Sequence, residues 1–350
     1  MELGKNILSL FDGISCGQLA LNKAGIRYDN YFASEIDKYA IKVTQANYPK
    51  TIQLGDVKKL DGCTLPKIDL LVGGSPCQGF SFAGKQLNFN DPRSKLFFEF
   101  VRLLKETKPK YFLLENVLMK KEYEQVITNQ LGVEPILINS NLVSAQNRKR
   151  LYWTNIPNVS QPTDKSISWG DIREHGVNTE SFYYTEKAMQ WLARVSQKKN
   201  KVLTVHSDTD NMQMLEASHH KKYSNQRYFG IADLPTDNQL ITSLREQQPI
   251  KYKGQHQFNR SEPYIYFDYN KETNVLNTLT TTNEIVPFTL PNKIPNTEFF
   301  FRYITPLECE RLQTVPDNYT NFVSNTQRYK MLGNGWTVDV IAHILKQINN

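Results

Sequence analysis

The chain has 350 residues, of which 39% are hydrophobic and 22% charged, and this ordinary composition predicts a globular protein with a large core and a second lobe. The formal net charge is +7, which favours a polyanionic partner. Residues 187–260 hold 12 basic and 6 acidic residues, so this stretch carries nearly all of the surplus charge.

The sequence shows no targeting or membrane segment. The first residues run directly into a strand-like stretch without a charged leader and long apolar run, and no apolar run approaches the roughly 20 residues of a membrane helix. We therefore expect a soluble, cytoplasmic protein. The four cysteines form no CxxC pair, which predicts reduced thiols rather than disulfides or a zinc site.

Short β-rich runs alternate with helical patterns from residue 5 to about residue 155. The strand candidates are NILSLF, YFASE, IDLLVGG and YFLLEN, and each is followed by a helical stretch. This alternation predicts a doubly wound, mostly parallel α/β sheet covered on both faces. Helical spacing predicts that Leu96, Phe100, Leu103 and Leu104 face the sheet.

The amino-acid composition changes after about residue 158. Residues 160–300 are rich in polar residues and Tyr with short strand candidates, whereas helical periodicity returns in TPLECERLQ and WTVDVIAHILKQI. We expect a first domain over residues 1–158, a smaller irregular domain over 159–298, and a segment over 299–350 that rejoins the first domain.

Chemically suggestive residues follow the first three predicted strands. Ligands of open parallel sheets bind beyond the carboxyl ends of the strands, where glycines allow close approach and carboxylates can accept from ribose hydroxyls or an adenine amine. Turns and helix N-caps explain any one of these residues alone, and GxGxxG is absent. Together they favour an adenosine-containing ligand. The residues are Phe11, Asp12, Gly13, Gly17, Glu35 and Asp56.

Cys77 follows the fourth predicted strand, and Pro76 stiffens its approach. A lone cysteine is usually a small buried hydrophobe, and protease chemistry would need a histidine nearby, yet all six histidines lie at position 175 or later. Instead Glu115 ends the fifth strand, and Arg148 and Arg150 alternate on an extended segment. For each of these charges alone, a helix-start acid or a solvated surface is the more common role.

Taken together, these stretches resemble the cytosine-C5 DNA methyltransferase family. The first loop and GNGW resemble its de novo eukaryotic type, while PCQ and the compact length resemble bacterial and phage enzymes. The matching stretches, in the family's order, are SLFDGISCG, ASEID, LGDV, GGSPCQGFS, YFLLENV, AQNRKRLYW, RYITPLECERLQTVP and MLGNGWTVDVIAHIL.

The resemblance implies a Rossmann-like methyltransferase that uses S-adenosylmethionine. Cys77 would add to C6 of a flipped cytosine, Glu115 would act at N3, Arg150 would hold O2, and Arg148 would support the geometry. Trp336 is equally compatible with a core position. The implied cofactor contacts are Phe11, Asp12, Gly13, Ile14, Gly17, Glu35, Ile36, Asp56, Val57, Pro76, Leu96, Asn334, Gly335 and Trp336.

The implied partner is double-stranded DNA, read by residues 159–298, with Gln78, Ser81, Arg227 and Thr280 as candidate contacts. A companion restriction endonuclease is a further candidate partner, and we expect a monomer. The alternatives are methylation of cytosine in tRNA and an inactive, methyltransferase-like DNA-binding regulator. Cys16, Cys63 and Cys309 are interpreted as structural.

Overall fold

The computed structural model describes residues 6–76, 95–174, 182, 204–205, 212–213, 231–232, 265–270, 275–280 and 301–349. The chain divides into two compact units. Unit 1 comprises Met1–Ser166, Gln213–Ala217 and Glu310–Asn350, and unit 2 comprises Ile167–Met212 and Ser218–Cys309.

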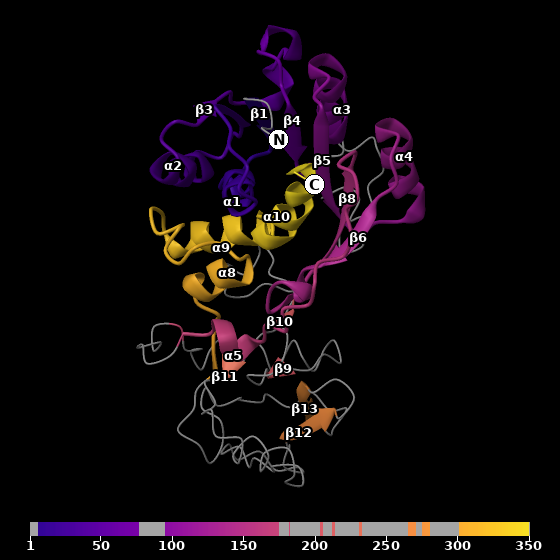
Figure 1. The fold of residues 1–350 in the computed structure, drawn as a ribbon. Coiled ribbons are helices and arrows are strands. Elements are labelled where there is room, and N and C mark those ends of the chain that lie inside the picture. The colour runs from indigo at the N-terminus through magenta and orange to yellow at the C-terminus, as the bar shows by residue number, and fades with distance from the viewer. Residues whose placement is uncertain are drawn as a thin grey trace. The chain divides into compact units, whose positions relative to one another are not determined.

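Unit 1 is built on a seven-stranded sheet with the order β3-β2-β1-β4-β5-β8-β6 (Figure 1). The pairs β1–β2, β1–β4, β2–β3 and β4–β5 are parallel, and β8 is antiparallel to both β5 and β6. This confirms the predicted doubly wound, mostly parallel sheet. The strands are β1 (Asn6–Leu10), β2 (Asn30–Ser34), β3 (Ile52–Gln53), β4 (Leu70–Gly73), β5 (Tyr111–Val117), β6 (Ile136–Asn139) and β8 (Lys149–Thr154), and β7 (Gln146–Asn147) lies outside this sheet.

Helices connect the strands and close the C-terminal segment. In the described part of the chain, none is long and apolar enough to cross a bilayer. The α-helices of unit 1 are α1 (Cys16–Lys23), α2 (Lys38–Asn47), α3 (Lys95–Thr107), α4 (Lys121–Leu131), α9 (Asn325–Asn334) and α10 (Val338–Lys346), with short 3-10 helices η1 (Val57–Lys59), η2 (Gly62–Thr64), η3 (Ser140–Leu142) and η6 (Gln347–Asn349).

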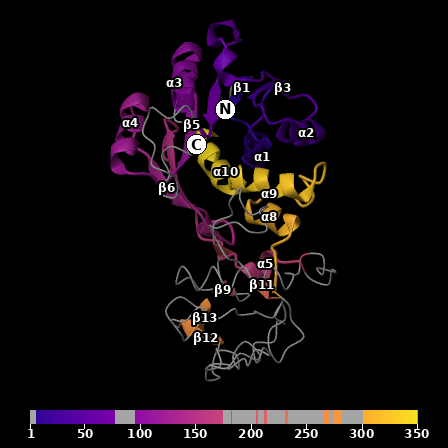
Figure 2. The ribbon, with the colours of Figure 1, turned by 180° about the vertical axis from the view of Figure 1, so that it is seen from behind.

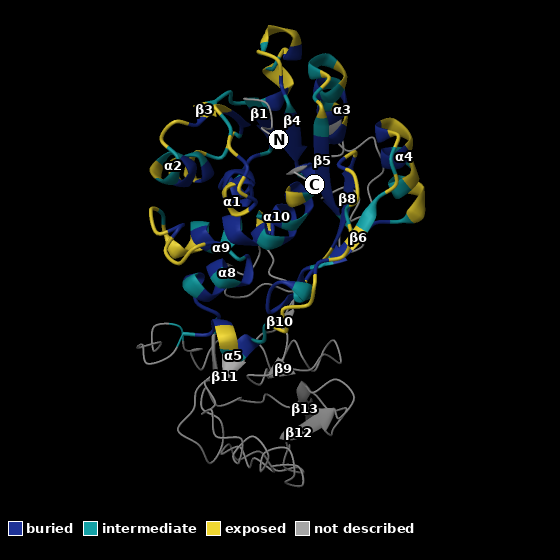
Figure 3. Ribbon diagram, viewed as in Figure 1, coloured by how far each residue is buried: buried dark blue, intermediate teal, exposed yellow. Residues whose placement is uncertain are grey.

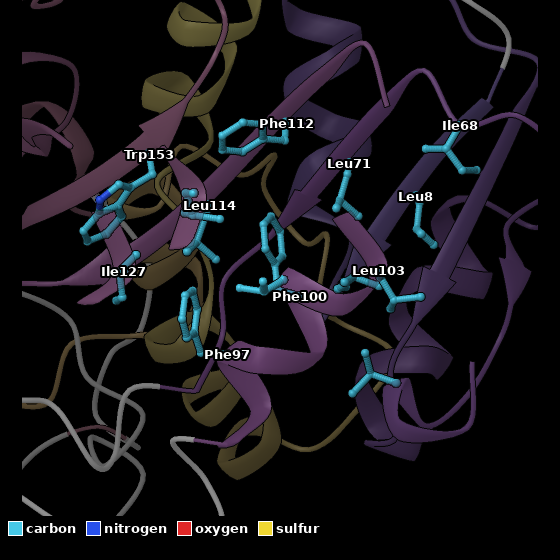
Figure 4. Close-up of a cluster of buried hydrophobic side chains, with 14 of the residues drawn as sticks. Leu8, Ile68, Leu71, Phe97, Phe100, Leu103, Phe112, Leu114, Ile127 and Trp153 are labelled. Carbon is cyan, nitrogen blue, oxygen red and sulfur yellow. The ribbon is translucent and has the colours of Figure 1, made fainter. Parts of the chain in front are cut away.

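Helices α3 and α4 cover one face of the sheet with a continuous apolar cluster (Figure 4). Phe97, Phe100 and Leu103 of α3 are completely buried, and Val101 is nearly so. The prediction for Phe100 and Leu103 is confirmed, but Leu96 and Leu104 are only partly buried. The helix is turned so that Phe97, rather than its neighbour Leu96, packs on the strands. Burying such large side chains supplies about 1.5–3 kcal/mol each.

The opposite face is covered by α1. Helix α10 of the C-terminal segment packs against α1 (Figure 2). Helix α10 begins at Val338 and buries its apolar stripe (Figure 3). Asp339 in its first turn accepts from Lys23 of α1 at 2.6 Å and from Lys165 at 2.8 Å. Helix α10, which lies in WTVDVIAHILKQI, is thus held in unit 1 by both apolar packing and these charges.

Unit 2 contains a buried polar cluster beside the short helix α5. The Glu308 carboxylate accepts from the backbone N–H groups of Glu174 at 3.0 Å and Thr305 at 2.8 Å, and Trp169 of α5 is completely buried. The remaining elements are α5 (Trp169–Ile172), β9 (Thr204–Val205), β10 (Met212–Gln213), β11 (Ile231–Ala232), β12 (Ile265–Asn270), β13 (Val275–Thr280), β14 (Phe301–Arg302) and α8 (Pro306–Leu312), the last of which continues into unit 1.

Candidate active site

A cavity of about 410 Å³ lies at the carboxyl ends of the central strands of unit 1. Its walls are the segments that follow β1, β2, β3, β4 and β5, together with helix α9 and the residues after it. This is the topological switch point, because the chain runs outward in opposite directions from β1 and β4, and such crevices are the usual ligand sites of doubly wound sheets.

The cavity brings together nearly all of the described residues that the sequence singles out. Gly17 does not line it. The predicted residues that do line it are Phe11, Asp12, Gly13, Ile14, Glu35, Ile36, Asp56, Val57, Pro76, Leu96, Glu115, Arg148, Arg150, Asn334, Gly335 and Trp336.

Cys77, Gln78, Ser81 and Arg227 lie outside the described residues, so their predicted roles stay predictions. Cys77 directly follows Pro76, which lines the cavity, and Thr280 is the last residue of β13.

The loop after β1 is held in an unusual backbone conformation. Phe11, Gly13 and Ser15 all have φ near +60°, a region that costs non-glycine residues energy and often marks functional loops. The Gly13 N–H donates to Glu35 Oε2 at 2.8 Å, and the Tyr319 hydroxyl donates to the Ile14 carbonyl at 2.7 Å. The loop is therefore fixed before any ligand binds.

The Glu35 carboxylate joins the loop after β1 to the segment after β2 by hydrogen bonds. Its Oε1 accepts from the backbone N–H groups of Ile36 at 2.7 Å and Asp37 at 2.8 Å, in addition to the bond from Gly13 to Oε2. A carboxylate has about four acceptor positions, so it can also accept from a ligand hydroxyl. The neighbouring Ile36 side chain is 75% exposed, an unusual position for a large apolar residue.

Two groups in the wall have pKa values raised by burial. Burial raises the pKa of Asp12 to about 6, against hydrogen bonds that lower it, and raises the pKa of the Cys16 thiol to about 12. Cys16 and Cys309 are buried as the structural interpretation requires, but Cys63 is exposed and cannot act as a core residue. A protonated, buried thiol such as Cys16 is unreactive.

Glu115 and Arg150 form an ion pair in the wall of the cavity. Arg150 Nε lies 2.9 Å from Glu115 Oε1, and both side chains are largely buried. The two residues come from the neighbouring antiparallel strands β5 and β8. A paired arrangement of a carboxylate and a guanidinium presents both an acid and a fixed positive charge to a planar polar ligand.

Arg148 faces the C-terminal end of α9. Its Nη2 donates to the carbonyl oxygens of Gly333 at 3.3 Å and Gly335 at 3.0 Å. A Cβ on Gly74 would lie 2.7 Å from Trp336 Nε1 and 3.2 Å from Glu115 Oε2, so glycine is needed there for both to approach. Trp336 is thus both buried and part of the wall, which combines the two predicted alternatives.

Helix α9 contributes wall residues that the sequence analysis missed. Gln327, Lys330 and Met331 line the cavity, and Lys330 Nζ donates to Asp37 Oδ2 at 2.7 Å. Burial acts to raise the pKa of Asp37, but the hydrogen bond and charge of Lys330 and the backbone N–H groups of Tyr39 and Ala40 together outweigh it, and the pKa is lowered. Ser324 at the N-cap, followed by Tyr329, Met331 and Leu332, is the signal that could have revealed this helix.

The switch-point cavity and its strand-end carboxylates define an α/β enzyme of the S-adenosylmethionine-dependent methyltransferase class. The chain belongs to the C-5 cytosine-specific DNA methylase family, whose model matches residues 5–350. This confirms the predicted family, the methyl donor and the predicted enzyme class, a DNA (cytosine-5-)-methyltransferase.

The chain is similar to bacterial and phage proteins along its whole length. It is 32% identical to the Type II methyltransferase M1.ScrFI of Lactococcus lactis subsp. cremoris, covering 98% of this chain and 77% of that one. It is 28% identical to the orphan methyltransferase M.SPRI of Bacillus phage SPR, covering 99% and 98%. The methyltransferase EhMeth of Entamoeba histolytica shares the fold, with a TM-score of 0.67 at 17% identity over 99% and 98% of the two chains.

Proposed function

We propose that the enzyme methylates a cytosine extruded from double-stranded DNA, with Cys77 as the attacking thiolate and Glu115 and Arg150 holding the pyrimidine. The buried Glu115–Arg150 pair carries this proposal, because it lines the same cavity as Pro76, which directly precedes Cys77. A buried ion pair is rarely a gain in stability, so its presence at a cavity favours a chemical role.

The described residues fit S-adenosylmethionine. Glu35 and Asp56 supply acceptors for hydroxyl and amine groups, and the exposed Ile36 offers an apolar surface to a purine ring. Asp12 has a buried Oδ2 without a hydrogen-bond partner in the described part of the chain, which suits a ligand donor. When bound, the cofactor supplies an electrophilic methyl group.

The side chains of the site make the cytosine ring reactive. The Cys77 thiolate forms a bond to C6, and the electrons of the C5–C6 double bond move toward N3 and O2. The ion-paired Glu115 carboxylate takes up a proton from solvent and passes it to N3 while Arg150 holds O2, so the developing charge is neutralised. After methylation at C5, a water molecule or a loop group takes the C5 proton and N3 returns its proton to Glu115. The double bond re-forms, and the sulfur leaves C6 as a thiolate.

A cytosine inside a duplex cannot present C6 to a thiol, so the target base must leave the stack. We assign target recognition to residues 159–298, whose basic stretch at 187–260 suits phosphate contacts. Gln78 and Ser81 are proposed contacts to the opened duplex, and Arg227 and Thr280 are proposed contacts within the recognition region. Replacing 159–298 by the segment of another family member should transfer the target sequence, and unchanged target choice would contradict this assignment.

The Type II names of several relatives favour a companion restriction endonuclease, and we propose that the methyltransferase itself acts as a monomer. A flipped base needs only one active site, so a single chain can complete the reaction. Light scattering of the enzyme on a duplex that carries one target site should give one chain per duplex.

The decisive experiment is covalent trapping. DNA containing 5-fluorocytosine should form a denaturation-resistant complex with the enzyme when S-adenosylmethionine is present, because fluorine at C5 cannot leave as a proton. Cys77→Ser should abolish both trapping and methylation, whereas Cys63→Ser, at an exposed thiol, should leave both unchanged. Trapping that persists in Cys77→Ser, or methylation of tRNA in preference to duplex DNA, would contradict the proposal.

A further inference from the structure

Gly17 is the second residue of α1, and the position of its missing side chain is already occupied. A Cβ placed there would lie 2.4 Å from Tyr31 Oη, closer than real Cβ contacts come, and 3.6 Å from Tyr31 Cζ. Because Gly17 lies within a helix, its backbone conformation does not require glycine. The glycine is needed because it leaves space for one hydroxyl group.

That hydroxyl belongs to a buried residue of β2 and reaches the cavity wall. Tyr31 is 2% exposed, and its Oη donates to Asp12 Oδ1 at 2.8 Å. Asp12 lines the cavity and is 9% exposed, while its Oδ2 has no hydrogen-bond partner within the described residues. One oxygen of the carboxylate is therefore anchored from within the protein, and the other lacks the partner that buried polar atoms normally have.

The groups facing Asp12 determine when it is charged. Burial raises its pKa to about 6; the neighbouring hydroxyl groups of Ser9, Ser15 and Tyr31 lower the value, and the charge of Glu35 raises it. A cationic ligand group in the cavity would favour the charged form and bind less well once Asp12 is protonated.

We propose that Tyr31 is a positioning residue of the cofactor site, whose hydroxyl, through the space left by Gly17, orients the Asp12 carboxylate toward the charged amino group of the cofactor's amino-acid end. This role presupposes the S-adenosylmethionine site proposed above. An N–H cation is the natural partner, because a carboxylate accepts hydrogen bonds and a sulfonium has none to donate.

The test uses the full-length protein and two ligands in calorimetric titrations. S-adenosylhomocysteine carries the amino-acid end, and 5′-methylthioadenosine lacks it. Tyr31→Phe should weaken the binding of S-adenosylhomocysteine about tenfold, the range expected for a hydrogen bond to a charged group. It should leave the affinity for 5′-methylthioadenosine unchanged. The wild-type titration checks the cofactor site separately, since no binding of either ligand would contradict the proposed cofactor residues themselves.

A second pair of substitutions tests the space at Gly17. Gly17→Ala should reproduce the loss seen in Tyr31→Phe, because the new methyl group displaces the hydroxyl. In the Tyr31→Phe background, Gly17→Ala should cause almost no further loss, because only ordinary 3.6 Å contacts to the ring and to Val72 Cγ2 remain. Additive losses would overturn the proposed role.

The pH profile separates positioning from a general structural effect. In the wild type, affinity for S-adenosylhomocysteine should rise as the pH increases through about 6. In Tyr31→Phe this rise should move to higher pH, because the charged carboxylate has lost a donor. The matched control is Tyr28→Phe, whose ring centroid lies 5.7 Å from that of Tyr31 but whose hydroxyl donates to Gln18. Equal profiles for the two variants, or equal losses for both ligands, would overturn the proposal.

Discussion

Glu115 Oε1 and Arg150 Nε lie 2.9 Å apart across the antiparallel strands β5 and β8, with side chains only 12% and 9% exposed. The two charges have lost most of their hydration, so each depends on the other for compensation. The pair has consequences for both stability and catalysis, which can be measured separately.

Arg150→Ala should destabilise the fold by roughly 3–5 kcal/mol, because the Glu115 carboxylate is left buried without its partner. The double variant Arg150→Ala/Glu115→Gln should recover part of this loss, since no unpaired charge remains. Urea unfolding measures the free energy. Arg311→Ala, which breaks the more exposed Arg311–Asp317 pair, serves as the control and should cost at most about 1 kcal/mol. Equal effects at the two sites would contradict the assigned burial cost.

Glu115→Gln should lower the methylation rate by about 10²–10⁴-fold, the usual contribution of a positioned acid or base. The amide keeps the shape of the side chain but cannot deliver a proton at N3, so S-adenosylhomocysteine affinity should hardly change. Single-turnover methylation and calorimetry measure the two quantities. Glu122→Gln, at an exposed position of α4, is the control. A parallel fall in cofactor affinity would indicate a structural role instead.

Arg148→Gln should weaken S-adenosylhomocysteine binding about tenfold, because the carbonyl groups of Gly333 and Gly335 lose a charged donor and Asn334 loses its support. Lys149→Gln changes the next residue, which is exposed at the start of β8, and should leave the affinity unchanged. Unaltered cofactor binding in Arg148→Gln, with a slower chemical step, would instead favour direct contact between Arg148 and the cytosine.

The cofactor-free protein should become more stable as the pH falls from about 6 toward 4, with Asp12 as the cause. Its pKa is raised from 3.8 to about 6 by burial, so the folded state binds a proton that the unfolded state has already lost in this window. The full effect is about 3 kcal/mol. Asp12→Asn should remove it and stabilise the unliganded protein at neutral pH. Thermal unfolding across this range, with and without S-adenosylhomocysteine, measures it; an unchanged pH dependence in Asp12→Asn would exclude Asp12.

Much of the site was predictable because its parts follow strands. Glu35 and Asp56 each stand directly after a short β-rich run, and the carboxyl ends of parallel strands meet at one edge of a sheet. Arg148 and Arg150 were predictable from period-two spacing. Helix α9 was missed because its amphipathic pattern is weak, so Lys330 and its bond to Asp37 were not anticipated.

Gly17 shows the limit of such predictions. Its spacing from Gly13 predicts a ligand contact, but the structure places it behind the loop, against Tyr31. A glycine that leaves space for a distant side chain and a glycine that admits a ligand look identical in a sequence. Only the packing of α1 on β2 distinguishes them.

By itself, the sequence determined the class of sheet, the alternation of strands and helices along the chain, and the family, since these follow from hydrophobic periodicity and from short motifs at strand ends. The tertiary structure alone decided which charges meet. Glu115 pairs with Arg150, Arg148 donates to carbonyl groups at the C-terminal end of α9, and Asp12 is held by Tyr31. The physical reason is that these contacts join residues far apart in the chain, and their strength depends on burial, which no local pattern encodes.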